Sequence, residues 1–330
     1  MLAVIADGVG GPEVLKVVER PVPSLGTGDA LVRVKATAIN RADILQRMGM
    51  YPAPPDAPAD ILGLEYAGVV EAVGDGVDRS WLGQRVMGIA GGGTYAQFVA
   101  VSAGTMMRIP DAMDFAHAAA VPEAFVTAHD ALFTIGRCAA GHNVLIHAIG
   151  SGVGVAAVQL ARAAGAKVFG TTRSPEKATR ARLYGLDVAL SPEHFDEEIR
   201  TQTDGHGADV VVDFVGATYL GRNVASLANH GTLVLVGLLS GAVGEVDLRL
   251  LLRRRARMEG TVLRSRSREE KAAASHAFED FARGRLGEGL ALRPVIDSVY
   301  ALSEAVAAHK KMSSNESFGK MILRVDHAGE

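Results

Sequence analysis

The chain has 330 residues, 48% hydrophobic and 22% charged, which is typical of an ordinary soluble globular protein and long enough for two domains. Its formal net charge of −3 excludes the basic overall field that holds nucleic acid or an anionic membrane. The one cysteine, Cys138, excludes an intrachain disulfide framework and any zinc site that needs two thiolates, and it fits a reducing cytoplasm.

The N-terminal part of the chain is expected to consist of strands and turns. The runs 32–39, 66–73 and 95–101 are rich in β-branched residues or alternate in polarity, and Gly, Asp and Pro bound them. Prolines within 51–58 exclude a central strand and predict a stiff loop. No basic segment precedes the first apolar run, so no secretory signal is expected.

The pattern of apolar residues changes near residue 143. Short apolar runs alternate with helical patterns, which predicts right-handed crossovers and a parallel sheet. The expected strands are 144–147, 167–171, 187–190, 209–215 and 231–237, with 258–263 as a candidate sixth.

Two further segments bear on the organisation of the chain. Residues 138–161 carry no Asp, Glu, Lys or Arg, but polar side chains and a glycine cluster interrupt them. A buried strand followed by a buried helix is therefore favoured over a membrane span. The C-terminal runs 294–300, 303–312 and 319–325 predict a strand, a helix and a strand that returns to pair with the first domain.

The stretch HAIGSGVGVAA, residues 147–157, lies where the first turn from strand to helix is expected. Gly150, Ser151, Gly152 and Val153 would bring backbone N–H groups and a helix N-terminus toward a pyrophosphate. The strict dinucleotide pattern fails, because Val155 stands in the place of its last glycine. Taken alone, a glycine-rich packing turn explains the cluster equally well.

The end of the second strand of this part indicates which nucleotide binds. Sites for NAD have an acidic residue there, whereas this chain has Thr172, Arg173 and Ser174, with Lys177 one helical turn beyond. Hydroxyl donors and cations suit a 2′-phosphate, which favours NADP(H). The alternative is two solvated charges at the start of a helix.

Five motifs together resemble the medium-chain dehydrogenase/reductase superfamily, and within it the zinc-independent quinone oxidoreductases. With LRSR added, the nearest likeness is among the animal members. The motifs are NRADILQRMGMYP (40–52), ILGLEYAGVVEAVG (61–74), AAAVPEAFVTAHDAL (118–132), VLIHAIGSGVGVAAVQLA (144–161), LRSR (263–266) and GKMIL (319–323). The resemblance implies an α/β protein with a mostly-β GroES-like catalytic domain at 1–123 and 292–330. It also implies a doubly wound Rossmann domain at 124–291 and a homodimer.

The resemblance also implies further cofactor contacts. Thr127 would hold the nicotinamide end, and Tyr51 would lie beside it. The remaining residues expected to bind the cofactor are Val236, Gly237, Leu238, Leu239, Ser240, Arg264 and Arg266. The chain departs from the family at Ile149, where a glycine is frequent, and near Pro192, where an aromatic residue is frequent.

The sequence also lacks the side chains that bind zinc in related enzymes. Zinc alcohol dehydrogenases of the superfamily have a Gly-His-Glu motif whose histidine binds the catalytic metal, and here Leu64 stands between Gly63 and Glu65. No cysteine occurs near Asn40 and Arg41, and the four-cysteine structural loop is missing. No catalytic zinc is therefore expected.

Without zinc to lower the pKa of an alcohol, reduction of a conjugated acceptor by NADPH is the favoured chemistry, with a quinone as the acceptor. Tyr51 and Asn40 are the candidate proton donors; alternatively, Tyr51 anchors the proline loop and Asn40 caps a turn. Glu123 receives no catalytic role. Reduction of activated alkenes, or cofactor binding with little turnover, are the competing hypotheses. The run RRRAR, 253–257, is interpreted as a solvated helix face rather than a nucleic-acid site.

Overall fold

The computed structural model describes residues 1–327, and these form two compact units. Unit 1 comprises Met1–Val126 and the segment from Leu263 onward, and unit 2 comprises Thr127–Val262. The sequence-based boundaries at 123 and 291 place α9, Arg268–Ala282, in the nucleotide-binding domain. In the structure α9 belongs to unit 1, because it packs against β5 (Arg85–Ile89), β7 (Met106–Arg108) and the 3-10 turn Ala103–Thr105 of that unit.

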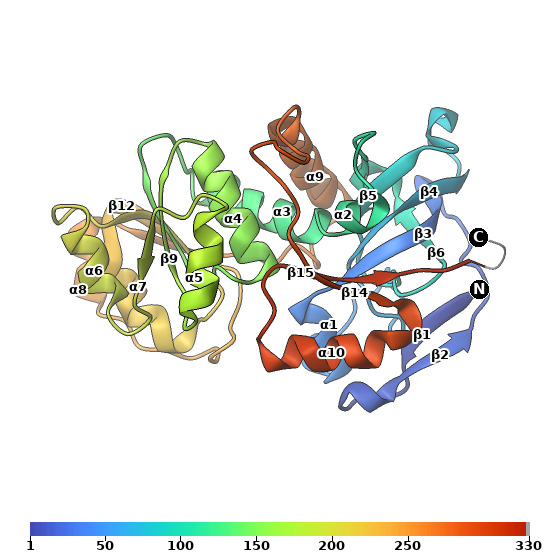
Figure 1. Ribbon diagram of the computed structural model, residues 1–330, viewed down its shortest axis with the longest axis horizontal. Helices are drawn as coiled ribbons and strands as arrows, with labels where there is room; N and C mark the ends of the chain where they lie inside the picture. Colours follow the sequence, from blue (N-terminus) through green and yellow to red (C-terminus); the bar gives the residue numbers. More distant parts are fainter. Residues whose placement is uncertain (328–330) are drawn as a thin grey trace. The chain divides into compact units, whose positions relative to one another are not determined.

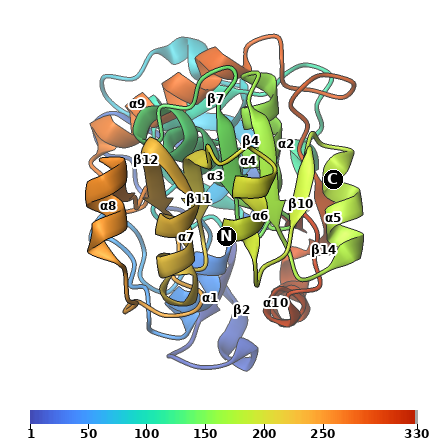
Figure 2. The same ribbon diagram turned by 90° about the vertical axis from the view of Figure 1, so that its left-hand side faces the viewer.

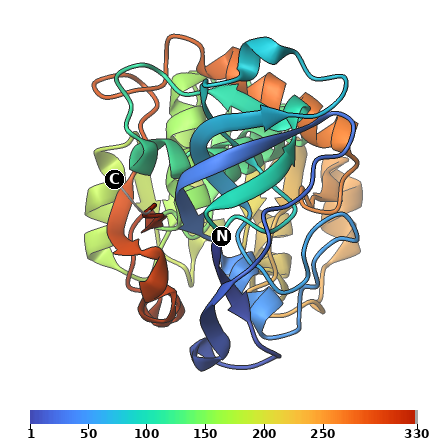
Figure 3. The same cartoon turned by 90° about the vertical axis from the view of Figure 1, so that its right-hand side faces the viewer.

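Unit 1 is built on a seven-stranded sheet with the order β14-β15-β3-β4-β5-β7, and β6 also pairs with β3. A separate antiparallel pair, β1 with β2, lies near the N-terminus (Figure 3). The strands are β1 Leu2–Ala6, β2 Leu15–Glu19, β3 Asp29–Ile39, β4 Glu65–Val73, β5 Arg85–Ile89, β6 Phe98–Ser102, β7 Met106–Arg108, β14 Ile296–Ala301 and β15 Lys320–Arg324. The strands predicted at 32–39 and 66–73 are confirmed as parts of β3 and β4, whereas the run 95–101 becomes a strand only from Phe98.

The C-terminal strand completes this sheet, as the sequence predicts. β15 runs antiparallel to β3, from Met321 opposite Ile39 to Arg324 opposite Ala36. Figure 1 shows the red β15 beside the blue β3. Alternate residues of β3 and β4, such as Val32, Val34 and Tyr66, are buried in the core, so the pleat of each strand places one face inward. The helices of unit 1 are α1 Arg41–Arg47, α2 Phe115–Ala119, α9 and α10 Ala305–Ser314.

Unit 2 is built on a six-stranded parallel sheet with the order β10-β9-β8-β11-β12-β13 (Figure 2). Its strands are β8 Asn143–Ile146, β9 Lys167–Thr171, β10 Val188–Leu190, β11 Ala208–Asp213, β12 Leu227–Leu235 and β13 Arg257–Gly260. All six expected strands, including the candidate sixth, are confirmed in this sheet. The central residues of β8 and β11 are fully buried, because helices cover both faces of a parallel sheet.

The helices of unit 2 follow its strands along the chain. They are α4 Gly152–Ala163, α5 Pro175–Arg182, α6 Phe195–Thr201, α7 Leu220–Ser226 and α8 Leu248–Arg254. The helix α3, Pro122–His129, contains the boundary between the units and continues into a π-helical turn, Asp130–Ile135. Single 3-10 turns are Pro12–Val14, Arg79–Trp81, Ala103–Thr105, Ala217–Tyr219 and Leu302–Glu304.

The arginine run 253–257 only partly fits its interpretation as a solvated face. Arg253 and Arg255 are exposed. Arg254, however, donates to the carbonyl oxygens of Val224 and Ala225 at 2.6 Å each, and Arg257 donates to that of Ile135 at 3.1 Å. Two of the arginines therefore tie backbone carbonyls together inside unit 2.

Candidate functional site

The strand order of unit 2 reverses between β8 and β11. The strands that follow β8 in the chain, β9 and β10, lie on one side of it, and β11 to β13 lie on the other. In open parallel sheets a ligand binds at the carboxyl ends of the strands where the order reverses, because the connections diverge there and leave a crevice. The candidate cofactor site is therefore at the ends of β8 and β11.

The glycine turn lies directly after β8. Ser151 caps helix α4, and its Oγ accepts a hydrogen bond from the N–H of Gly154 at 3.0 Å. A Cβ atom on Gly154 would lie 2.3 Å from the carbonyl oxygen of Ala148, so only glycine fits this close approach. The N–H groups of Gly152 and Val153 donate to no acceptor within residues 1–327. The start of α4 thus offers free donors and a positive dipole end, which fits a pyrophosphate.

The end of β9 forms the wall of a pocket of about 610 Å³. Its lining residues are Thr172, Arg173, Ser174, Pro175, Ala178, Thr179, Arg182, Ala189, Leu190, Ser191, Pro192 and Glu193. Arg173 is exposed, and its guanidinium donates no hydrogen bond to any residue in the described part of the chain. The end of β9 therefore presents an available cation and several hydroxyl groups, a set of donors that would suit a phosphate group.

The other residues predicted around this phosphate have local structural roles as well. The hydroxyl oxygen of Ser174 caps α5 by accepting from the N–H of Lys177 at 3.2 Å, and Thr172 Oγ1 accepts from the N–H of Ser174 at 3.2 Å. The aliphatic chain of Lys177 covers Gly150, where an added Cβ would lie 2.7 Å from its Cδ. Lys177 thereby links the glycine turn to α5.

The predicted segment 236–240 lies against the end of β11. The N–H groups of Val236 and Gly237 donate to the carbonyl oxygen of Asp213 at 2.8 and 3.2 Å. Further along, Leu239 and Ser240 donate to the carbonyl oxygens of the two residues after Asp213. This segment and the glycine turn are thus both at the reversal of strand order, as the resemblance implies.

A buried histidine that the sequence did not single out connects the ends of these strands. His147, directly after β8, has Nδ1 2.8 Å from Thr171 Oγ1 and Nε2 2.7 Å from Asn223 Oδ1. Asn223 Nδ2 donates to Asp213 Oδ2 at 2.9 Å. The carboxylate of Asp213 in turn accepts from the N–H groups of Val215 and Gly216. Four segments that surround the candidate cofactor site are therefore held by one hydrogen-bonded chain.

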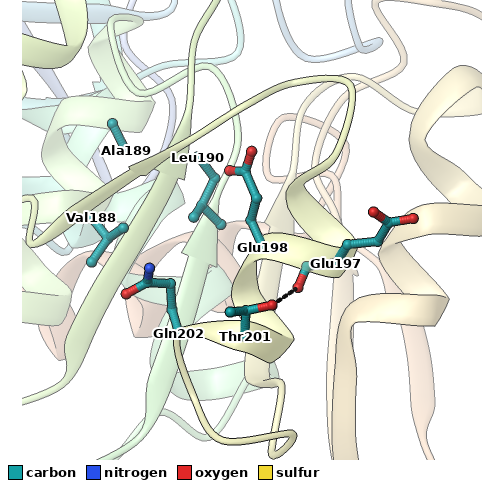
Figure 4. A pocket seen from close by; sticks show the side chains of 7 residues that line it. All are labelled: Val188, Ala189, Leu190, Glu197, Glu198, Thr201 and Gln202. Atoms are coloured by element: carbon teal, nitrogen blue, oxygen red, sulfur yellow. Dashed lines mark hydrogen bonds between the residues drawn. The ribbon is translucent and has the colours of Figure 1, made fainter.

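A smaller pocket, of about 290 Å³, lies between β10 and α6 at the edge of the sheet (Figure 4). Leu190 and Val188 contribute apolar side chains, and Glu197 and Glu198 contribute carboxylates. The hydroxyl of Thr201 donates to the carbonyl oxygen of Glu197 at 3.0 Å, a contact internal to α6. None of the predicted site residues lines this pocket.

In unit 1, Asn40 belongs to a buried ionic cluster. Its Nδ2 donates to Glu65 Oε1 at 2.8 Å, and its Oδ1 accepts from Lys320 Nζ at 2.6 Å. Lys320 Nζ is also 2.6 Å from Glu65 Oε1, and the backbone N–H of Glu123 donates to Glu65 Oε2 at 2.9 Å. The side-chain amide of Asn40 is therefore already engaged, and its backbone N–H donates to Asp43 at the start of α1.

A second hydrogen-bonded chain lies next to this cluster. Asp43, which is fully buried, accepts from the N–H of Gly63 at 3.0 Å and from Tyr95 Oη at 3.2 Å. His309 Nε2 is 3.1 Å from Tyr95 Oη, and its Nδ1 is 3.4 Å from Arg47. Burial raises the pKa of Asp43 to about 6 and lowers that of His309 to about 3. This chain holds α1 against the loop at Gly63.

Tyr51 is half-buried under a guanidinium. Arg264 lies over the ring of Tyr51, 5.3 Å from its centroid, and donates to the carbonyl oxygens of Tyr51 and Gly91 and to Gln46 Oε1. Burial raises the pKa of Tyr51, so its hydroxyl stays protonated at neutral pH. Arg264 and Arg266 belong to unit 1, whereas the glycine turn belongs to unit 2. Arg264 is buried and serves to hold Tyr51.

The residues do not fit a catalytic zinc ion of the alcohol dehydrogenase type. Leu64, at the position of the metal-binding histidine, is 1% exposed and has no donor atom. Among residues 1–327, no group of three or more His, Cys, Asp or Glu side chains is arranged to hold a metal. Buried positive charge in unit 1 comes instead from side chains, among them the ammonium group of Lys320 and the guanidinium groups of Arg47 and Arg264.

The comparisons with known proteins agree with this architecture. The model for the alcohol dehydrogenase GroES-like domain matches residues 26–111, and the model described as zinc-binding dehydrogenase matches residues 152–279. A quinone oxidoreductase of Rattus norvegicus is 33% identical over 98% of this chain and 97% of its own length. The chain belongs to the medium-chain dehydrogenase/reductase superfamily. The GroES-like and Rossmann-type fold expected from the sequence is confirmed.

Solved structures of the superfamily resemble the chain throughout. A mycobacterial protein in complex with NADPH is 32% identical, with a TM-score of 0.86, over 98% of this chain and all of its own. A protein described as an NAD-dependent alcohol dehydrogenase has the same identity and TM-score over 99% of this chain and all of its own. Similarity of fold therefore does not by itself indicate whether NADPH or NAD binds.

A much larger protein also matches. A mycocerosic acid synthase-like polyketide synthase of Mycobacterium tuberculosis is 36% identical over 92% of this chain, but the chain spans only 14% of that protein.

Across the described residues, no helix is both long and apolar enough to span a membrane.

Proposed function

We propose that this chain is an NADP(H)-dependent, zinc-independent reductase of quinones. The free N–H groups at the start of α4, together with the available guanidinium of Arg173 in the pocket at the end of β9, carry this proposal. The NADPH complex of the mycobacterial relative and the quinone oxidoreductase of the rat support it. Because the buried side chain of Leu64 has no atom that can bind zinc, this position supports a reaction without zinc.

Each group of residues has a distinct task in this proposal. The glycine turn and α4 bind the pyrophosphate, and Thr172, Arg173, Ser174 and Lys177 bind the 2′-phosphate. Bound NADPH supplies a hydride, and the acceptor must be a conjugated π system because no metal polarises it. Tyr51 donates a hydrogen bond to the carbonyl oxygen of the acceptor, and Arg264 holds the ring of Tyr51 in place. Asn40 instead orients Glu65 and Lys320.

The proposal is tested with purified protein, NADPH and a panel of quinones. NADPH oxidation is expected to require added quinone and to proceed at the same rate after exhaustive treatment with EDTA. Titration calorimetry is expected to detect NADPH binding in the absence of any acceptor. Loss of turnover on chelation contradicts the zinc-independent scheme, and the absence of binding heat from folded protein contradicts the whole proposal.

Reduction of an activated alkene is the second candidate. The match to a segment of a polyketide synthase favours it, since the acceptor of that relative need not be a quinone. The hydride step is the same, but a proton must then be added to carbon, which requires a positioned acid. The ratio of kcat/KM for a quinone to that for an enone decides between the two candidates.

We also propose that the protein is a cytoplasmic homodimer. β13 is the edge strand of the sheet in unit 2, and Met258 on it and Val262 just beyond it are 45% and 48% exposed. An exposed edge with apolar side chains can pair with a second copy across a two-fold axis. Light scattering is expected to give twice the mass of the chain, and Met258→Lys combined with Val262→Lys is expected to give the monomer. The free thiol of Cys138 fits a reducing compartment.

A further inference from the structure

A second arginine lines the pocket at the end of β9. The helix α5 gives one face to this pocket, with Ala178, Thr179 and Arg182 among the lining residues (Figure 2). These three side chains share a face because residues three and four apart along a helix adjoin. Arg182 therefore faces the same space as Arg173, although nothing in the spacing of the nucleotide-binding motif indicates it.

The guanidinium group of Arg182 is available to a ligand. Arg182 is exposed, and its side chain makes no hydrogen bond, ion pair or ring contact with any of residues 1–327. Arg162, near the end of α4, differs in this respect, because it pairs with Asp187 at 3.1 Å. The two arginines of the pocket are thus both unpaired.

The balance of charge in the pocket favours an anion. Arg173 and Arg182 are the cations among its lining residues, and Glu193 is the carboxylate. Glu193 accepts a hydrogen bond from Ser191 Oγ at 2.8 Å, within its own loop, and forms no ion pair with either arginine. The lining therefore has a surplus of one positive charge, and a ligand with negative charge would compensate it.

The loop after β10 forms another wall of the pocket, and a third arginine holds it. Arg222 donates to the carbonyl oxygen of Pro192 at 3.1 Å and to that of Glu193. The guanidinium of Arg222 also lies over the rings of Phe195 and Tyr219, 5.4 Å from each centroid. Because this loop is tied to the rest of unit 2, its wall of the pocket is formed before any ligand binds, which reduces the cost of binding.

We propose that Arg182 is a second binding residue for the 2′-phosphate of NADP(H), an inference that rests on the proposed function. Side chains of a helix lean toward its N-terminus. Arg182 therefore leans over Ala178 toward the end of α5 that Arg173 precedes. A phosphate monoester has about two negative charges at neutral pH, so two guanidinium groups match it better than one. Arg182 is thus a residue that determines specificity for the phosphorylated nucleotide.

Titration calorimetry of the full chain with adenosine 2′,5′-bisphosphate tests this inference. The probe has a 2′-phosphate but no nicotinamide, so its binding depends on unit 2 alone. Arg182→Ala is expected to raise the Kd of the probe about tenfold and the Kd of NADH, which has no 2′-phosphate, less than about twofold. Arg182→Glu is expected to raise the Kd of the probe by about 10²-fold, because a carboxylate repels the phosphate.

Two further variants separate recognition of the phosphate from a general effect of charge. Arg182→Lys keeps the charge but not the planar fork, and its Kd for the probe is expected to lie between those of the wild type and Arg182→Ala. Arg253→Ala is the matched control: Arg253 is also an exposed arginine in the last turn of a helix of unit 2, but it is outside the pocket. This control is expected to change the Kd of the probe less than about twofold.

The outcomes distinguish this inference from the function on which it rests. Wild-type protein that binds NADPH no more tightly than NADH overturns both the assignment of the 2′-phosphate and the role of Arg182. A wild-type preference for NADPH that Arg182→Ala leaves unchanged overturns the role of Arg182 alone, and so do equal rises in both Kd values. Protein that shows the expected effects of Arg182 but reduces no quinone supports this inference and overturns the proposed reaction.

Discussion

His147 Nε2 lies 2.7 Å from Asn223 Oδ1, in the interior of unit 2. Because Asn223 donates from Nδ2 to Asp213, its Oδ1 must accept, and the imidazole therefore carries its proton on Nε2. Nδ1 then accepts from the hydroxyl of Thr171. Every polar atom of this neutral imidazole is satisfied, so the end of β8 is tied to the ends of β9 and β11 at the candidate cofactor site.

Asn223→Ala is expected to lower the free energy of unfolding by about 2–4 kcal/mol, because it leaves the N–H of His147 buried without a partner and removes one of the hydrogen bonds to the buried carboxylate of Asp213. Urea denaturation followed by circular dichroism measures the change. Gln202→Ala, at an exposed helix end, is expected to change it by less than about 0.5 kcal/mol. Equal effects of the two substitutions contradict a structural role for the hydrogen bonds that Asn223 makes with His147 and Asp213.

The stability contributed by neutral His147 depends on pH. Burial lowers its pKa to about 4 in the folded state, against about 6.5 when unfolded. The folded state then binds fewer protons, so this contribution is complete above pH 6.5 and is lost as pH falls toward 4, by about 3 kcal/mol. His147→Gln is expected to weaken the dependence of unfolding free energy on pH between 6.5 and 4. His276→Gln, in an exposed position on α9, is expected to leave it unchanged.

Arg173→Ala is expected to raise the KM for NADPH at least tenfold and to change the KM for NADH less than twofold, because only the first nucleotide has a 2′-phosphate. Steady-state kinetics with both nucleotides at saturating quinone measures the difference. NADH serves as the internal control for folding. A parallel rise in both KM values excludes the assignment of Arg173 to the phosphate.

Tyr51→Phe keeps the ring under Arg264 and removes only the hydroxyl. The kcat for quinone is expected to fall about tenfold, the effect of one lost hydrogen bond in the transition state. A large loss restricted to enones instead favours the alkene reductase. An unchanged kcat for both kinds of acceptor contradicts a role of the Tyr51 hydroxyl in the reaction.

Gly154→Ala is expected to weaken NADPH binding at least tenfold and to lower the melting temperature, because its methyl group meets the carbonyl oxygen of Ala148 at 2.3 Å. The α4 N-terminus then has to shift. Gly221→Ala is a matched control in α7, where the nearest atom to the added Cβ is 3.4 Å away. Calorimetric titration of both variants with NADPH measures the effect, and equal affinities contradict a close approach at Gly154.

Much of unit 2 could be predicted from sequence, because a strand buried on both faces is a short apolar run and a helix has its own period. β12 begins at Leu227, before the expected start at 231. There a register shift opposite Ala208 and a left-handed His230, at φ 62°, interrupt the apolar pattern. Such irregularities depend on the neighbouring strand and leave no local signal.

The ionic cluster of unit 1 was less predictable. Asn40, Glu65 and Lys320 are far apart in the sequence, and only the pairing of β15 with β3 brings the ammonium to the carboxylate. The motif GKMIL contained Lys320, but nothing in its spacing indicates burial. The sequence is compatible with Glu123 as a buried structural acid, but its raised pKa depends on burial and on the neighbouring Glu65, which only the fold brings next to it.

The pairing of β15 with β3 also has a consequence for synthesis on the ribosome. The strand that carries Lys320 emerges after all of unit 2, whereas Glu65 emerges before it and is fully buried in the folded protein. Until that ammonium arrives, burying Glu65 would isolate a carboxylate from water without a counter-charge. Unit 2, whose residues are contiguous, can therefore fold before β15 is synthesised, whereas unit 1 completes its folding only once β15 has left the ribosome.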